Sequence, residues 1–262
     1  MTTLTESARP STRQRPVFYL AMGGIFALIA FAGFTRTYLL PIVMNRFDGP
    51  AMLHLHGALF FGWMILLAWQ SGLVQRRRVD AHRAWGMAGI SIATAMVFTT
   101  VALVVRGLDF AATTGNLHHT RVLAIAPLSQ ISLFAAFVAA AIIAVRQPET
   151  HRRLMLLATA NLLPPAVARL FGVVLAPANA GRPNFALVTD ESLAFAVTLT
   201  AALVVDILIV AAIVRDWRVR GRPHAAYILG GASMVLVQLL RQPFSHTSLW
   251  QWITNGLLAL AR

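Results

Sequence analysis

The sequence predicts an all-α protein, a polytopic membrane helix bundle of about seven transmembrane helices with its N-terminus inside and its C-terminus outside. The first observation is composition: 58% of the 262 residues are hydrophobic and only 12% are charged, about half the charged share of a soluble domain. The second is a series of apolar stretches, each long enough to cross about 30 Å of hydrocarbon. The third is the uneven distribution of arginine between the connections.

The elements are expected in a simple order along the chain. Residues 1–16 are polar and predict a disordered cytoplasmic tail. The membrane domain follows over 17–241, with its core bundle at about 50–175. Residues 244–262 form a shorter amphipathic stretch with two tryptophans, which we expect to lie on the outer interface. The seven predicted spans are 17–35, 52–74, 83–105, 120–145, 152–176, 190–214 and 224–241.

The orientation follows from arginine, which supplies every basic residue because the chain contains no lysine. With the N-terminus inside, the inner segments hold 14 arginines, the outer segments hold 7, and Arg169 falls within a span. Cytoplasmic loops carry the positive excess in membrane proteins, so the distribution predicts this orientation, and we expect a bacterial inner membrane. The net charge of +13 therefore reflects topology, and the expected partner is the lipid bilayer rather than nucleic acid.

Two missing residue types limit the chemistry. The absence of lysine excludes a retinal Schiff base. The absence of cysteine excludes disulfides, iron–sulfur clusters and thiolate metal sites. A metal or haem iron must therefore be held by histidine, methionine or carboxylate. Nothing in the sequence indicates a soluble catalytic domain, so an enzymatic role would be that of a transmembrane oxidoreductase.

The eight histidines lie in two layers at the ends of the predicted spans. The outer layer holds His54, His56, His118, His119 and His246, and the inner layer holds His82, His151 and His224. Four consecutive spans each begin with histidine, on alternating sides. This arrangement suits two b-type haems, one near each face, because each iron takes two axial imidazoles from facing helices. Spans two and four would supply the outer pair, and spans three and five the inner pair.

Helical geometry narrows the choice of outer ligands. His54 and His56 differ by about 200° around a helix, so only one of them faces the bundle. The face of His56 carries aromatic and amide residues, whereas that of His54 is purely apolar, which favours His56. The second outer ligand is His119 or His118, which the sequence does not separate. The face of His82 continues through glycines, which permit close approach of a flat macrocycle.

Two ionisable residues lie within the spans, where such groups are functional candidates. Arg169 follows His151 by 18 residues, or five helical turns, so the two are expected to share a face. We expect Arg169 to bind a haem propionate or an anionic substrate, unless it extends to the membrane surface. Asp206 lies in the inner half of the sixth span. It would accept a hydrogen bond from His82, His151 or His224, or else pair with an inner arginine.

The order of these histidines resembles the ascorbate-reducible di-haem cytochrome b family over about residues 50–175. The resemblance implies two ligand pairs, which correspond to His56 (or His54) with His118 (or His119), and to His82 with His151. The family has six spans and lacks the Pro164-Pro165 break. The strings HLHGALFFGW, DAHRAWGMAG and THRRLMLLAT are also similar to a group of small bacterial inner-membrane proteins of uncharacterised function, which supports the fold alone.

Two other functions fit the same residues. A copper or zinc site on the outer face would use four histidines if the second span began late enough for His-x-His to be extended, namely His54, His56, His118 and His119. A cofactor-free transporter or assembly factor is suggested by Pro164-Pro165, which breaks the fifth helix beside Arg169. For the haem protein, the expected partner is a quinone or a small redox donor. The sequence does not specify an oligomeric state.

Overall fold

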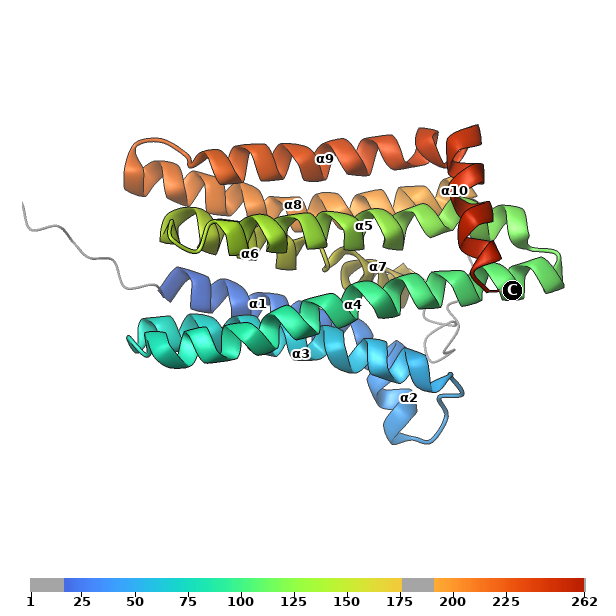
Figure 1. Ribbon diagram of the computed structural model, residues 1–262, viewed down its shortest axis with the longest axis horizontal. Helices are drawn as coiled ribbons and strands as arrows, with labels where there is room; N and C mark the ends of the chain where they lie inside the picture. Colours follow the sequence, from blue (N-terminus) through green and yellow to red (C-terminus); the bar gives the residue numbers. More distant parts are fainter. Residues whose placement is uncertain (1–16, 176–190, 262) are drawn as a thin grey trace, which may run out of the picture.

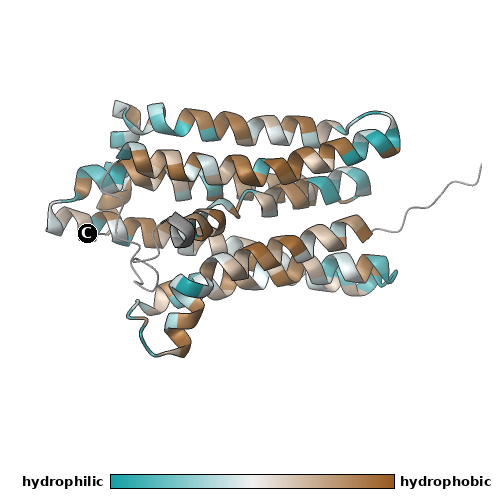
Figure 2. Cartoon of the chain, turned by 180° about the vertical axis from the view of Figure 1, so that it is seen from behind, coloured by the Kyte–Doolittle hydropathy of each residue, from teal (hydrophilic) through white to brown (hydrophobic). Residues whose placement is uncertain are grey.

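The computed structural model describes residues 17–175 and 191–261, and the predicted tail 1–16 lies outside the described residues. Within them every regular element is helical, so the predicted all-α bundle is confirmed. The long helices run alternately in opposite directions along one axis (Figure 1). Hydrophobic residues cover most of their length and hydrophilic residues gather at their ends (Figure 2), as a membrane-spanning bundle requires.

Six rods are long and apolar enough to cross a membrane. They consist of α1 with a π-helical turn η1 and α2, then α3, α4, α5, α6 with α7, and α8. The bounds are α1 Val17–Phe34, η1 Thr35–Leu39, α2 Leu40–Val43, α3 Ala51–Gln75, α4 Val79–Thr114, α5 Leu117–Ile143, α6 Pro148–Ala160, α7 Pro164–Leu175, α8 Glu191–Arg220, α9 Ala225–Ser245 and α10 Ser248–Ala259.

The seventh predicted span forms α9, which packs against α5, α6 and α8 in the bundle. It is not among the six rods that are apolar enough by composition, since its outer half carries Gln238, Arg241 and Gln242. We call the end at which α1 begins the inner end and the opposite end the outer end, after the predicted orientation. On that definition α9 runs from the inner to the outer end beside α8 (Figure 1).

Short connections hold successive helices antiparallel. Three arginines, Arg76–Arg78, join α3 to α4 at the inner end. At the outer end α4 stops at Gly115, whose φ of 80° is the left-handed conformation that ends many helices. The helix α4 has 36 residues and so is longer than the predicted span 83–105. Its last turns include Arg106 and Asp109 and extend beyond the thickness of about 30 Å that a span needs.

The fifth span is broken where the two prolines predict. Helix α6 ends at Ala160 and α7 begins at Pro164. Two tight turns close the break, with Leu162 N donating to Thr159 O at 3.1 Å and Leu163 N donating to Ala160 O at 3.0 Å. Prolines have no N–H, so they suit the first turn of α7, where donors would lack partners. The break therefore leaves few unsatisfied groups in the bundle.

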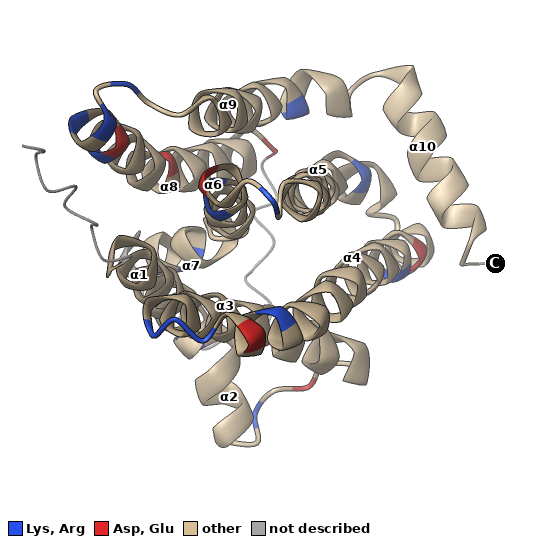
Figure 3. Cartoon of the chain, turned by 60° about the vertical axis from the view of Figure 1, so that its left-hand side comes forward, with Lys and Arg blue, Asp and Glu red and all other residues tan. Residues whose placement is uncertain are grey.

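Helix α6 lies at the centre of the bundle (Figure 3), and the rod it forms with α7 is the most buried of the six. Trp63 on α3 donates its Nε1–H to Thr159 Oγ1 of α6 at 3.1 Å. Gly33 on α1 lies directly against the backbone of Ala166 on α7, where a Cβ would clash. The fully buried centre of the core is Phe26, Met96, Phe134, Leu157 and Leu163.

Helix α10 lies across the outer ends of the long helices, packed on α4 and α9 (Figure 1). The indole of Trp250 donates to the carbonyl oxygen of Arg121 on α5 at 2.8 Å, which holds α10 in place. The sequence predicts an interfacial segment over 244–262, and a segment of this kind would lie across the bundle axis, as α10 does. The segment begins later than predicted, because α9 continues to Ser245.

Candidate functional site

The two inner histidines, His82 and His151, lie side by side. His82 is in the first turn of α4 and His151 in the first turn of α6. Their ring centroids are 6.3 Å apart and the ring planes are nearly perpendicular, at 86°. The sequence predicted this pair, and the fold brings it together although the two residues are 69 positions apart in the chain.

Hydrogen bonds leave ring nitrogens of this pair free to act as ligands. His151 Nδ1 lies 2.8 Å from Ala141 O on α5, so Nδ1 carries the proton and Nε2 is left with a lone pair. His82 Nδ1 is buried and has no hydrogen-bond partner among the described residues. Gln70 Nε2 donates to the carbonyl oxygen of His82 at 3.1 Å and fixes the start of α4.

The spacing and surroundings of the inner pair fit a shared metal centre. With metal–nitrogen bonds of about 2 Å, two imidazoles on opposite sides of one ion place their ring centroids about 6 Å apart. Two neighbouring positions are small: Gly86 on α4, where a Cβ would meet only Gln70 Nε2 at 3.8 Å, and the buried Ala141 on α5, whose carbonyl oxygen lies beside His151. Helix α5 packs against both α4 and α6.

On the outer side, α3 directs its two histidines to opposite neighbours, as helical geometry predicts. His56 Nδ1 lies 3.4 Å from Thr99 Oγ1 on α4, and its ring packs on Phe60. His56 is also close enough to Arg169 for their charges to interact. His54 Nδ1 instead lies 3.2 Å from the hydroxyl of Tyr38, away from α4. The expectation that His56 faces the bundle agrees with this geometry.

The structure also separates His118 from His119. The side chain of His119 is 19% exposed and that of His118 is 79% exposed. His119 Nε2 is buried without a hydrogen-bond partner among the described residues. Both rings lie near Glu191 at the start of α8, at 3.7 Å for His119 and 3.6 Å for His118. His119 is therefore the histidine that faces inward, although no ring contact joins it to His56 in the described part of the chain.

The alternative outer metal site is not assembled as a single cluster. In residues 17–175 and 191–261, no group of three or more histidine, aspartate or glutamate side chains is placed to hold a metal ion. The second span begins at Ala51, before His54, so the His-x-His segment is helical rather than extended. His54 lies near Tyr38 and His56 near Thr99, whereas His118 and His119 both lie near Glu191.

Arg169 lies on α7, beyond the break in the fifth span. The break between α6 and α7 interrupts the phase, so a shared face with His151 does not follow. Its Nη1 donates to Pro165 O at 2.9 Å, and its guanidinium lies 4.3 Å from the centroid of the Phe34 ring. Its Nε is buried with no partner among the described residues. The cation lies instead near His56, in the outer part of the bundle.

Asp206 contacts α9 rather than the histidines that the sequence suggested. Gln238 Nε2 donates to Asp206 Oδ1 at 3.3 Å, and Arg241 is the charged group that acts on Asp206. The position of Asp206 midway along α8 explains this, since the inner histidines lie at the ends of their helices. It is therefore not in place to orient His82, His151 or His224.

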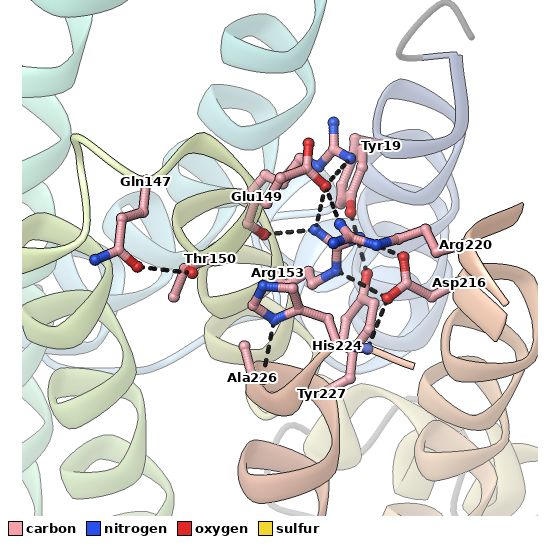
Figure 4. Close-up of polar contacts among 11 residues, drawn as sticks. Tyr19, Gln147, Glu149, Thr150, Arg153, Asp216, Arg220, His224, Ala226 and Tyr227 are labelled. Carbon is pink, nitrogen blue, oxygen red and sulfur yellow. Dashed lines mark hydrogen bonds and ion pairs between the residues drawn. The ribbon is translucent and has the colours of Figure 1, made fainter. Parts of the chain in front are cut away.

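Sequence reasoning missed a buried ion-pair network at the inner end (Figure 4). Arg153 on α6 is fully buried and forms a bidentate pair with Asp216 on α8. Arg153 Nη1 also donates to Glu149 Oε2 at 2.8 Å, and Arg220 Nη1 donates to the same oxygen at 2.6 Å. The only sequence signal was the i, i+4 spacing of Glu149 and Arg153, which is common on exposed helix surfaces.

His224 joins this network and caps α9. Its backbone N–H donates to Asp216 Oδ2 at 2.9 Å, and its Nδ1 accepts from the N–H of Ala226 at 3.1 Å. Burial, together with the positive charges of Arg153 and Arg220, lowers the pKa of His224 below its ordinary value. The neutral ring is therefore favoured, and only the neutral ring can accept the capping hydrogen bond.

Comparison with protein-family models, with curated proteins and with solved structures gives no match to this chain. The geometry of its own residues is therefore the basis for assigning a function.

Proposed function

We propose that this chain is an integral membrane b-type cytochrome-like protein that carries electrons across the bilayer through histidine-ligated haem. The inner haem would be held by His82 and His151. A second haem would lie towards the outer face, with His56 and His119 as its ligands and Arg169 beside a propionate. The observation that carries the proposal is the distance of 6.3 Å between the rings of His82 and His151.

The residues around the inner pair have definite roles in this proposal. Ala141 O accepts a hydrogen bond from Nδ1–H of His151, which fixes the tautomer and makes Nε2 a better ligand. Gln70 holds the first turn of α4 and so the backbone of His82. When bound, haem would supply one-electron transfer, with His82 and His151 as the residues that hold it. Two hollows among the described residues lie at the outer end and neither adjoins this pair, so side chains near Gly86 would move aside for the macrocycle.

The proposed setting is a bacterial inner membrane with the N-terminus in the cytoplasm, supported by the excess of inner arginines. Electrons would then pass between a quinone or small redox donor at one face and an acceptor at the other. Two centres, one near each face, divide a thickness of about 30 Å into shorter steps.

The test is the visible spectrum and haem content of the detergent-purified protein from haem-sufficient cells. We expect the sharp reduced bands of a low-spin bis-imidazole haem and a haem-to-protein ratio approaching two. His82→Ala should remove about one haem and leave the other, and His56→Ala should do the converse, because the two sites share no ligand. His54→Ala is the matched control, since this neighbouring histidine faces the other way and its loss should leave both haems.

Other outcomes would point to the alternative functions. A colourless preparation with iron well below one per chain would end the cytochrome proposal. Copper or zinc that is lost with His54 and His118 but not with His82 would favour the outer metal site. No stoichiometric metal at all would favour a cofactor-free transporter or assembly factor, which the broken fifth span and Arg169 support.

A further inference from the structure

A polar hollow lies at the outer end, where α5 begins, α9 ends and α10 begins. Its volume is about 170 Å³, room for about five water molecules at about 30 Å³ each. Its polar lining comes from all three helices and their connections: His118, Arg121, Ser245, His246 and Gln251. None of these groups belongs to the inner pair or to the His56 and His119 set.

The lining offers hydrogen-bond donors and a fixed positive charge. Arg121 is permanently cationic, and no carboxylate lines the hollow within residues 17–175 and 191–261. One end of its guanidinium donates to Asn255 Oδ1 of α10, but its Nε is buried with no hydrogen-bond partner among the described residues. The charge of the guanidinium favours an anionic ligand, because hydrogen bonds between charged groups are the stronger ones.

The first turn of α10 adds to the positive character of the hollow. Gln251 and Trp250 lie in this turn, and Thr247 caps it by accepting from the N–H of Trp250 at 3.2 Å. The N-terminal end of a helix carries a partial positive charge, which favours a nearby anion. Trp250 also bonds to the backbone of Arg121, so the charge and the helix end are held together rigidly.

One negative group lies nearby and has to be considered. Glu191 does not line the hollow, but its Oε1 is 3.6 Å from Nε2 of His118. It orients the imidazole of His118, whose side chain is largely exposed at the rim. Its charge opposes a bound anion and would assist a bound cation. The response to removing this charge therefore reveals the sign of the ligand.

We propose that this hollow binds a small oxyanion, a carboxylate or a phosphate group, at the outer face. Arg121 supplies the counter-charge. His246 and Gln251 supply neutral hydrogen bonds at the rim, and the size of the hollow admits one small anion but not a larger ligand. The site stands independently of haem binding, because it uses none of the proposed ligands.

The test measures binding of inorganic phosphate and of acetate to the purified protein by titration calorimetry in a neutral detergent. We expect saturable binding at one site per chain. His246→Ala should weaken binding about fivefold, as expected for the loss of one hydrogen bond. Glu191→Gln should strengthen it about threefold, because a repelling charge is removed. Gln242→Ala is the control, since this exposed residue of α9 does not line the hollow.

Arg121→Gln should abolish binding, and His246→Ala keeps the test decisive if the arginine variant fails to fold. A second arm adds phosphatidylglycerol to the detergent. Binding of the lipid but not of free phosphate, weakened by His246→Ala, identifies a lipid headgroup as the source of the oxyanion. Absence of binding in both arms overturns the proposal. So does binding of Zn²⁺ that is lost in Glu191→Gln and His246→Ala, since that pattern identifies a cation site.

Discussion

His118 and His119 are neighbours in the sequence, yet only one of them faces the bundle. The phase of α3 separates His54 from His56 because both lie on one unbroken helix beside a long, recognisable aromatic face. No comparable aromatic face guides the choice between His118 and His119. They lie in the first turn of α5, about 100° apart around the helix. Burial separates them, since the side chain of His119 is largely covered and that of His118 is largely exposed. This difference depends on tertiary packing and cannot be read from local sequence.

His224, which caps α9, should make the stability of the folded protein depend on pH. The pKa of His224 is lowered in the folded protein, so the unfolded chain binds a proton at a higher pH than the folded one. Stability is therefore fully present above the ordinary histidine pKa of about 6.5 and falls as the pH drops below it. We expect thermal unfolding of the detergent-solubilised protein to shift to lower temperature between pH 7 and pH 5.

His224→Asn should flatten this dependence, because asparagine caps a helix without titrating in this range. His246→Ala serves as the control, since this exposed histidine takes no part in the inner network. An equal loss of stability on acidification in the wild type and in His224→Asn would contradict the assignment.

At the scale of elements, the fifth span shows which features a sequence reveals. Pro164-Pro165 predicts the break, because proline cannot continue a helix from the preceding turn. The direction of α7 after the break does not follow, since three residues of turn reset the helical phase. The sequence argument that Arg169 shares a face with His151 therefore does not hold across the break, and Arg169 lies in the outer part of the bundle near His56. Polar residues in α9 and at the end of α4 led to predicted spans that end too early. The two helices continue to Ser245 and Thr114.

The contact between α1 and α7 can be tested with a pair of glycines on one helix. A Cβ at Gly33 would collide with the backbone of Ala166, whereas a Cβ at Gly24 would meet nothing within 4 Å. Gly33→Ala should lower the free energy of unfolding by about 1–3 kcal/mol, the cost of overpacking a closed contact. Gly24→Ala should be neutral or stabilising, because alanine favours the helix by about 0.5–1 kcal/mol. Unfolding titrations in mixed micelles measure both, and equal responses would contradict the close approach.

At the scale of the whole molecule, composition and apolar periodicity were enough to predict the class of fold. The number of crossings depends on α9, which carries Gln238 and Arg241 and is not among the helices that are apolar enough to span by composition. A helix of this kind is stabilised in a membrane by its neighbours rather than by its own hydropathy. Neighbours are a property of tertiary structure, which explains why composition alone leaves this rod outside the set of six.

The predicted topology has a direct test. A reporter fused after Arg220 should be cytoplasmic, and one fused at the C-terminus should be periplasmic, because α9 crosses between them. A reporter fused after Arg78 provides a control, since the connection between α3 and α4 is also predicted to be cytoplasmic. If the fusions after Arg220 and at the C-terminus report the same side, α9 does not cross and the seven-span arrangement is wrong.

The pairing of Arg153 with Asp216 has a consequence for biogenesis. The two residues are 63 positions apart, so at about 5–20 residues per second the cation leaves the ribosome about 3–13 s before its partner. During that interval the central helix carries an arginine that only Glu149 can neutralise. Insertion of α6 into its final place must therefore wait for α8. A nascent chain truncated before α8 would present a half-neutralised charge, which membrane quality-control proteases are suited to detect.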